Sequence, residues 1–413
     1  MRRTRWGSSV GLLSAVLCLT ACLGTGETIE PLAFDPPSSF DLERAVPLTE
    51  DEAQDGTLHG TTLFVVIDGV LRATDLGDER QLWSTRLPTD TDQDYLRPPF
   101  VLGGTVIVAT GELPKDVTPE SNYTVNLFGF DASTGETRWE MSTPMYTLLA
   151  PRFGLQLSER DGELLVTMGF QTAPFATLLL DPGTGELRWK ADVVLVASTD
   201  DRYAVATPEN QFTASHAVAL DLETGEVVAQ LSETGSTCGQ SYVDPHEGGS
   251  SITFSVVNED STVSFFRFSS TDATVQPFTP VEGDIRYAAG SSCSLEEGQT
   301  VALCQVGPSD LAYGVDAVSG QVLWAFDGSD GPTLEYAGQY HGSVYGLLGG
   351  EYVVVALATG EIINRNLEVS PATVTNSLTQ SSSAKVNEYG AVGIPDDNAM
   401  RSQSLYVWAP ASG

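Results

Sequence analysis

Three cysteines in the second half of the chain are the residues whose spacing most readily suggests chemistry. Cys293 and Cys304 flank the segment Glu-Glu-Gly-Gln at 296–299, which suits a hairpin turn. Residues at equal distances from a turn face each other across a hairpin, so in an exported protein this pair can form a disulfide. The short loop that it closes would contribute about 2–3 kcal/mol. Two buried thiols on neighbouring strands are the alternative; we favour the disulfide, which leaves Cys238 unpaired.

Cys238 also precedes His246 closely enough to raise the question of a cysteine–histidine nucleophile. Nearness in sequence does not bring two side chains together in space, and a buried free cysteine is commoner than a catalytic one. We therefore predict no catalytic residue. The histidines also lack the spacing of a zinc-binding motif; they are His59, His216, His246 and His341.

Alternating carboxylates form a weak candidate for a calcium site. Asp90, Asp92 and Asp94 present hard oxygen ligands at every second position. They lack the glycine after the third ligand and the distal glutamate of an EF-hand loop, so a solvated acidic loop is the favoured interpretation. The segment 327–331 is equally ambiguous. Since the chain has no Walker phosphate loop and no G-x-S-x-G motif, we predict neither a metal nor a cofactor.

A repeated sequence motif predicts the strands and turns that position these residues. It consists of an aspartate, a turn ending in Thr-Gly or Ser-Gly, and a tryptophan eight residues after the aspartate. Alternating apolar residues precede the turn, which predicts a hairpin in which glycine supplies a positive φ and aspartate bonds the turn amides. Strong copies are Asp131–Trp139, Asp181–Trp189 and Asp316–Trp324, and weaker ones begin at Asp75, Asp221, Ser269 and Ala356. The fixed place of the tryptophans favours packing between repeats over ligand stacking.

The motif recurs with a period near fifty residues. This period predicts an all-β fold: an eight-bladed β-propeller of four-stranded antiparallel blades. A seven-bladed propeller with a decorated tail is the alternative. An eighth copy begins at Leu405, whose segment to Gly413 matches Leu127–Gly135 in shape, but it stops before its outer strand. We expect the segment 44–48 to supply that strand and close the ring, which removes exposed sheet edges.

The N-terminal residues predict export and lipid anchoring. A positively charged start and a short apolar run precede Leu19-Thr20-Ala21-Cys22, which resembles a bacterial lipobox. An ordinary secretory peptide with an incidental cysteine is the alternative. We predict a lipoprotein signal peptide at 1–21, a lipidated Cys22 that opens an acidic tether at 22–57, and a propeller at 58–413. No later segment reads as a membrane span.

The charge of the chain limits its partners. It carries 55 acidic and 20 basic residues, a formal net charge of −35, and loss of the arginine-rich signal would make it more acidic. Such a field repels nucleic acid and anionic lipid surfaces and favours basic partners or cations. We predict no nucleic-acid binding. Simple solubility is the favoured explanation of the charge.

The D-x-x-T-G-x-x-x-W motif resembles the repeat of pyrroloquinoline-quinone-like β-propellers. This family includes quinoprotein alcohol dehydrogenases, with quinone and calcium at the propeller axis, and non-enzymatic lipoproteins similar to the BamB subunit of the outer-membrane assembly machinery. The enzymes carry two adjacent cysteines over the cofactor, and this chain has no adjacent pair. The resemblance therefore implies a non-enzymatic lipoprotein scaffold.

The resulting functional prediction is a lipid-anchored scaffold of the cell envelope. We expect it at the outer membrane, with other envelope proteins as partners and a contact loop at 111–121. The alternatives are an enzyme or sensor that binds a quinone, small ligand or cation in the central channel, and an adhesin or polysaccharide binder.

Overall fold

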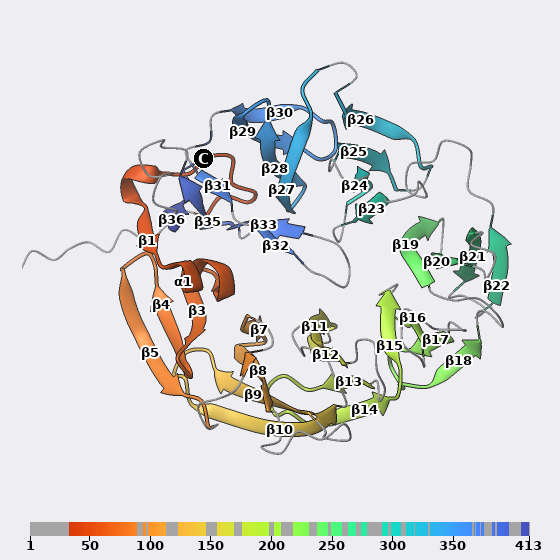
Figure 1. The fold of residues 1–413 in the computed structure, drawn as a ribbon, viewed down its shortest axis with the longest axis horizontal. Helices are drawn as coiled ribbons and strands as arrows, with labels where there is room; N and C mark the ends of the chain where they lie inside the picture. Colours follow the sequence, from red (N-terminus) through yellow and green to blue (C-terminus); the bar gives the residue numbers. More distant parts are fainter. Residues whose placement is uncertain are drawn as a thin grey trace, which may run out of the picture. The chain divides into compact units, whose positions relative to one another are not determined.

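The computed structural model describes residues 33–88, 94–95, 98–112, 123–145, 155–168, 176–197, 202–207, 218–230, 238–246, 249–257, 263–269, 274–278, 291–295, 299–306, 311–317, 319–328, 331–365, 367, 369–371, 373–375, 382–384, 386–395 and 406–412. They belong to one compact unit, Pro31–Gly413. The fold is all-β, built from antiparallel sheets, seven of which use consecutive strands in the described part of the chain (Figure 1).

The first four sheets follow the chain in order. The first sheet contains β2 (Thr57–His59), β3 (Thr62–Ile67), β4 (Val70–Asp75) and β5 (Arg80–Arg86). The second contains β6 (Asp94–Tyr95), β7 (Phe100–Leu102), β8 (Thr105–Glu112), β9 (Tyr123–Asp131) and β10 (Thr137–Met145). The third contains β11 (Leu155–Arg160), β12 (Glu163–Met168), β13 (Ala176–Leu180) and β14 (Leu187–Ala191). The fourth contains β15 (Val194–Ala197), β16 (Tyr203–Thr207), β17 (Val218–Asp221) and β18 (Val227–Gln230).

The next three sheets repeat this plan. The fifth contains β19 (Cys238–His246), β20 (Gly249–Val257), β21 (Val263–Ser269) and β22 (Thr274–Phe278). The sixth contains β23 (Ser291–Ser294), β24 (Val301–Val306), β25 (Leu311–Asp316) and β26 (Val322–Phe326). The seventh contains β27 (Leu334–Tyr340), β28 (Ser343–Leu348), β29 (Glu351–Ala356) and β30 (Ile362–Arg365).

The last sheet joins the two ends of the described chain. Its C-terminal strands are β31 (Val369–Pro371), β34 (Val386–Asn387), β35 (Gly390–Pro395) and β36 (Tyr406–Pro410). The segment 44–48, expected to add a strand here, contains β1 (Val46–Leu48), which pairs antiparallel with β36 through Val46 opposite Trp408. A separate pair is formed by β32 (Thr373–Thr375) and β33 (Ser382–Ala384).

Middle strands are buried and outer strands are half-exposed. Every residue of β13 is buried, because neighbouring sheets cover both faces, whereas β14 alternates exposed and buried residues and forms the edge. The outer strands β5, β10, β14, β18, β26 and β30 carry a bulge at the same place, as between Leu187 and Trp189. The middle strands therefore supply the core, and the outer strands are left to join one sheet to the next.

Hydrophobic clusters lie between successive sheets. Ile107 of the second sheet packs with Leu164 of the third, and Leu179 of the third packs with Leu220 of the fourth. Further clusters join the first sheet to the second, the sixth to the seventh and the seventh to the last. Leu63 of the first sheet also packs with Trp408 of the last. Sheets that pack face to face in chain order, with the last on the first, form the architecture of a β-propeller.

Helices are short in the described part of the chain. The 3-10 helix η1 (Leu42–Arg44) precedes β1, and α1 (Glu50–Asp55) follows it. Thr49 and Glu52 form a capping box at the start of α1. Among the described residues no helix has the length and apolar character needed to cross a membrane.

Candidate functional site

The aspartate of each strong repeat organises its own turn. One carboxylate oxygen of Asp131 accepts the backbone amides of Ser133 at 2.9 Å and Thr134 at 3.0 Å, and also the Ser133 hydroxyl. The other oxygen accepts a hydrogen bond from Nη2 of Arg138 at 2.6 Å. The hydroxyl of Ser133 and the guanidinium of Arg138 hold the pKa of Asp131 well below its usual range. Asp131 is therefore ionised at neutral pH and serves the turn.

The same turn persists where the side chain differs. Asp181 bonds the amides of Gly183 and Thr184, and the amide and hydroxyl of Thr184 lower its pKa. At Ala356 no carboxylate is present, yet the Gly360 amide still donates to the Ala356 carbonyl at 2.8 Å. The backbone thus defines the turn and the aspartate reinforces it.

Each tryptophan of the repeat docks on the turn of the next sheet, which confirms packing between repeats. At four junctions in the described chain, the indole Nε1 donates to the carbonyl of the residue that follows the first motif position of the next copy. The pairs are Trp83 with Ala132 at 2.9 Å, Trp139 with Pro182 at 2.8 Å, Trp189 with Leu222 at 2.9 Å and Trp324 with Leu357 at 2.6 Å.

The turn glycine has two physical reasons to be glycine. Gly185 adopts a φ of 70°, a left-handed conformation that side chains disfavour. A Cβ at this position would also lie 2.6 Å from the Trp139 ring. In the first sheet Glu79, which stands where later copies have glycine, adopts a φ of 51°. The glycine is thus required above all where a tryptophan of the preceding sheet docks.

The junction between the seventh and last sheets lacks this tryptophan. Asn364 occupies the position, and its amide donates to the carbonyl of Ser38 at 2.8 Å. The backbone amide of Asp41 donates to the Pro410 carbonyl at 2.9 Å, and by the match of the last copy Pro410 stands where Ala132 accepts Trp83. Phe40 is 3% exposed and packs against Tyr345. An N-terminal segment therefore takes the place of the tryptophan.

This segment, residues 33–41, is here called the N-terminal strap. The Phe34 amide donates to the Glu388 carbonyl at 2.7 Å, and the Tyr345 hydroxyl donates to the Pro37 carbonyl at 2.8 Å. Asp35 contacts Nδ1 of His341. The neighbouring Tyr340 is partly buried and donates its hydroxyl to Glu388, and both effects raise its pKa above the usual range. The strap thus touches both the seventh and the last sheets.

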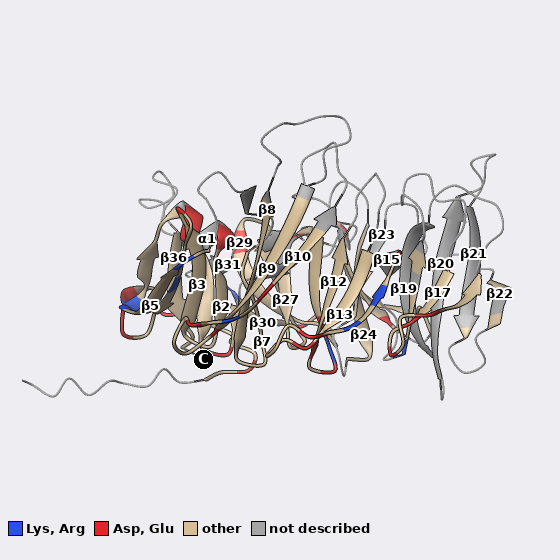
Figure 2. Cartoon of the chain, turned by 90° about the horizontal axis from the view of Figure 1, so that it is seen from below, with Lys and Arg blue, Asp and Glu red and all other residues tan. Residues whose placement is uncertain are grey.

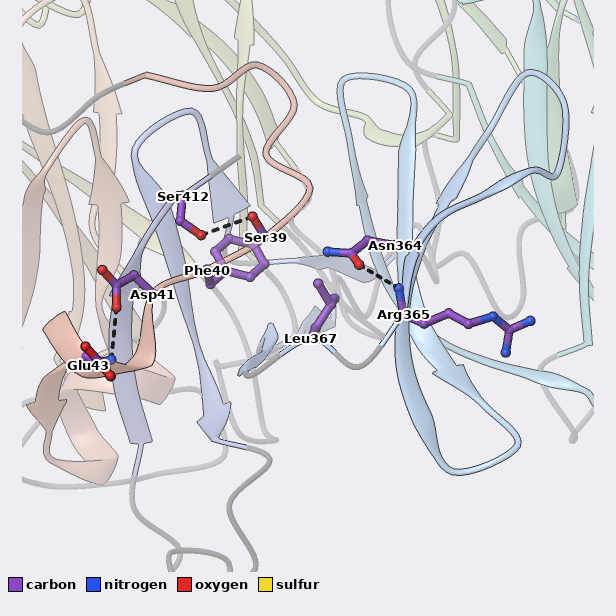
Figure 3. Close-up of a pocket in the computed structure, with 8 residues that line it drawn as sticks. All are labelled: Ser39, Phe40, Asp41, Glu43, Asn364, Arg365, Leu367 and Ser412. Atoms are coloured by element: carbon purple, nitrogen blue, oxygen red, sulfur yellow. Dashed lines mark hydrogen bonds between the residues drawn. The ribbon is translucent and has the colours of Figure 1, made fainter.

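A cavity of about 390 Å³ lies beside the strap (Figure 3). Figure 3 shows Phe40 and Leu367 facing each other across it, while the Arg365 side chain points away from Phe40. Nη1 of Arg365 lies 3.3 Å from Glu351. The lining residues are Ser39, Phe40, Asp41, Glu43, Asn364, Arg365, Leu367 and Ser412. This mixed lining, with two carboxylates and one apolar side, is suited to a peptide backbone more than to a metal ion.

The cysteine pair predicted from the sequence lies within one sheet. Cys293 of β23 is directly opposite Cys304 of β24, and the two form a disulfide with Cα atoms 4.0 Å apart. Cys304 is fully buried. A bridge between adjacent strands of one sheet is unlike two neighbouring cysteines held over a quinone.

The other predicted residues fall mainly outside the described part of the chain. Cys22, Asp90 and Asp92 lie there, as do residues 113–121 of the expected contact loop and His216. Asp94 lies in β6, and Cys238 and His246 lie in β19, but only their backbones are described. His59 is exposed in β2. Within the described ranges no group of three His, Cys, Asp or Glu side chains could hold a metal ion.

Acidic side chains gather at turns and strand ends. Figure 2 shows them in α1, at β29 and along the turns that join strands. Glu136, Glu186 and Glu226 each follow a turn glycine and are exposed. They give the turns of these sheets a repeated negative charge.

The fold and its junctions define a class of protein: a β-propeller-type repeat protein in which a tryptophan of one sheet docks on the turn of the next. Within it, residues 33–193 match the family model described as outer membrane protein assembly factor BamB. The resemblance of the repeat to pyrroloquinoline-quinone-like proteins similar to BamB is thereby confirmed over this part of the chain.

Solved structures with a similar fold include proteins of different activities. BamB from Moraxella catarrhalis is 16% identical, with 72% of this chain and 80% of that chain covered and a TM-score of 0.42. The dihydro-heme d1 dehydrogenase NirN is 13% identical, with 81% and 75% covered and a TM-score of 0.46. The quinohemoprotein alcohol dehydrogenase ADHIIG from Pseudomonas putida HK5 is 14% identical, with 87% and 66% covered and a TM-score of 0.37. No curated protein matches the chain.

Proposed function

We propose that this protein is a lipid-anchored, eight-bladed β-propeller that acts as a non-enzymatic scaffold in outer-membrane protein assembly. Cys22 carries the lipid after removal of residues 1–21, and residues 58–413 form the propeller. Its partners are other envelope proteins. The observation that carries the proposal is the match of residues 33–193 to the BamB family model.

Two features of the chain support this proposal. The junctions of the sheets use the repeat residues themselves: Trp139, Asp181 and Gly185 join the second sheet to the third. These residues are therefore structural, and the loops and rims remain available for partners. The acidic turns favour partners with basic surfaces and keep the scaffold away from anionic lipid.

The anchoring part of the proposal is tested by fractionation. The native chain should sediment with the outer membrane, and Cys22→Ser should appear in the soluble envelope fraction, because the variant has no thiol to lipidate. Cys238→Ser is the matched control and should sediment as the native chain does. If the native chain is recovered in the soluble fraction, lipid anchoring is wrong.

The scaffold part is tested by crosslinking the native lipoprotein in detergent-solubilised envelopes, followed by purification and mass spectrometry. Stoichiometric recovery of outer-membrane assembly proteins is expected. A variant that lacks residues 112–120 should keep its melting temperature and recover less partner. Recovery of the propeller alone would contradict the scaffold and direct attention to quinone, calcium or glycan ligands of the channel.

A further inference from the structure

The N-terminal strap is bound to the rest of the protein much as a peptide ligand would be. Phe40 is its one large buried side chain among the described residues. Hydrogen bonds join its backbone to Asn364, Tyr345 and Pro410, which come from the seventh and last sheets. An extended backbone bonded at intervals, with one aromatic side chain in a pocket, is a common form of peptide recognition.

The strap and β1 are anchored in different clusters. Phe40 packs with Tyr345 and Leu367, whereas Leu48 of β1 packs with Leu63 and Trp408. Between them lies η1, which contains no buried residue and whose Leu42 is only partly buried against the Phe40 cluster. Because Leu48 of β1 is held in a separate cluster, the pairing of β1 with β36 does not depend on the strap.

The side-chain pairs at the surface of the strap are weak, although the Tyr345 hydroxyl bonds the Pro37 carbonyl in the interior. Asp35 and His341 are each more than half-exposed, and the hydroxyls of Ser39 and Ser412 meet at the surface. Exposed pairs of this kind contribute little to stability. The cavity beside Phe40 also removes packing from one side of the strap. Segments with few buried contacts open before the core does.

We propose that the strap is releasable: residues 33–41 leave their groove as one unit, with η1 as the hinge, while the sheets remain folded. The groove is the surface of the seventh and last sheets that the strap covers, formed by Tyr345, Asn364, Leu367 and Pro410. The emptied groove is a binding site for an extended segment that carries a phenylalanine, and the strap is its ligand within the same chain. A second copy of the strap sequence is the occupant that we expect, because the same residues already fill the groove within the chain. This device does not depend on lipidation or on the scaffold role.

The first test measures exchange in the unmodified chain. The amides of Phe34, Asp41 and Ser412 form the hydrogen bonds between the strap and the last sheet. They should exchange with deuterium together and at least tenfold faster than the amides of Val407 and Trp408 in β36. Exchange of both groups at one rate would show that the strap opens only with the sheet and would overturn the proposal.

The second test supplies the strap in trans. The probe is a fluorescent peptide of residues 33–41, added to the native chain and to Phe40→Ala. A segment of the same chain acts at millimolar effective concentration, so the native chain should bind the peptide at least tenfold more weakly than Phe40→Ala. A peptide with alanine in place of Phe40 should bind to neither.

Filling the groove provides the matched control. In Phe40→Ala combined with Asn364→Trp, the new indole can reach the Pro410 carbonyl as tryptophans do at other junctions, and peptide binding should be lost. Equal peptide binding to the native chain and Phe40→Ala, or none to a folded Phe40→Ala, would overturn the proposal. Should Phe40→Ala fail to fold, the exchange measurement decides.

Discussion

The junction between the second and third sheets and the junction between the seventh and last sheets solve one packing problem differently. In the first, Trp139 fills the space and donates to Pro182 from a neighbouring sheet. In the second, Asn364 leaves that space open, and Phe40 and the backbone of the strap occupy it. A side chain carried by an outer strand is fixed when the sheet forms, whereas a strap must arrive from elsewhere. The junctions that are filled by a tryptophan are therefore permanent, whereas the junction that is filled by the strap can open.

The largest expected effect is the removal of a regular joint. Trp139→Ala should lower the free energy of unfolding by about 3–5 kcal/mol, since it empties a buried site and deprives Pro182 of its donor. Denaturant titration followed by circular dichroism measures this. Leu187→Ala, on an exposed position of β14, is the control and should change stability by less than about 0.5 kcal/mol. Equal effects would show that the tryptophan is not the joint.

A somewhat smaller effect is expected at the strap. Phe40→Ala should cost about 2–3 kcal/mol, because the groove is open on one side and can partly collapse. Adding Asn364→Trp should recover part of that loss by restoring the regular joint. Differential scanning calorimetry of the three chains compares them. A double variant less stable than Phe40→Ala would refute the equivalence of strap and tryptophan.

Two glycines allow the cost of a positive φ angle to be distinguished from the cost of a steric contact with a tryptophan ring. Gly185 and Gly162 have similar positive φ angles, but only Gly185 faces a ring, and nothing lies within 4 Å of a Cβ at Gly162. Gly162→Ala should cost about 1 kcal/mol for its backbone, and Gly185→Ala about 2 kcal/mol or more. Thermal unfolding of both variants measures the difference. The same loss for both would remove the contact with Trp139 from the explanation.

Loss of a single hydrogen bond at the strap should be smaller still. Asn364→Ala leaves the Ser38 carbonyl without its donor and should cost about 1 kcal/mol. It should also accelerate exchange of the Asp41 amide, because the strap is held less firmly. Glu361→Ala, at an exposed position just before β30, is the control for both readouts. An unchanged exchange rate in Asn364→Ala would mean that this bond does not hold the strap.

The smallest effect concerns pH. The folded pKa values of Asp131 and Asp181 lie below the ordinary value of about 3.9, so their charge stabilises the fold above that pH and ceases to do so as pH falls through the folded values. Asp131→Asn with Asp181→Asn keeps one oxygen for the turn amides, removes the charge and replaces the oxygen that accepts from Arg138 or Arg188. Urea titration should find this variant slightly less stable than the native chain at pH 7, and the difference should shrink as the pH is lowered from 5 toward 2. A difference that stays constant over this range would contradict a charge effect.

Local regularity explains what could be predicted from the sequence. The turn glycines and the capping aspartates follow from a repeated sequence motif, since each has its cause within a few residues. The inter-repeat role of Trp139 follows from the fixed period of that motif, because its partner Pro182 occupies a set place in the next copy. Cys293 and Cys304 also share one hairpin. Their pairing could be inferred from distance to the turn.

The part of the site that could not be predicted is the replacement of a repeat tryptophan by a segment far away in the sequence. Asn364 stands visibly at a tryptophan position, but Ser38, the residue that it bonds, lies 326 residues away in the sequence. No periodic pattern links Phe40 to a tryptophan that is missing from another repeat. The His341–Asp35 and Tyr340–Glu388 contacts follow from the same docking. Such a site becomes visible only when the ends of the chain meet.

The pairing of β1 with β36 also has a kinetic meaning. Val46 and Trp408 are partners, so β1 remains without its neighbour until β36 has been made and brought back to it. Pairings that close long loops are slow to form. The rate at which this protein matures should therefore be set by the docking of β36, and a chain that lacks β36 should accumulate with β1 unpaired.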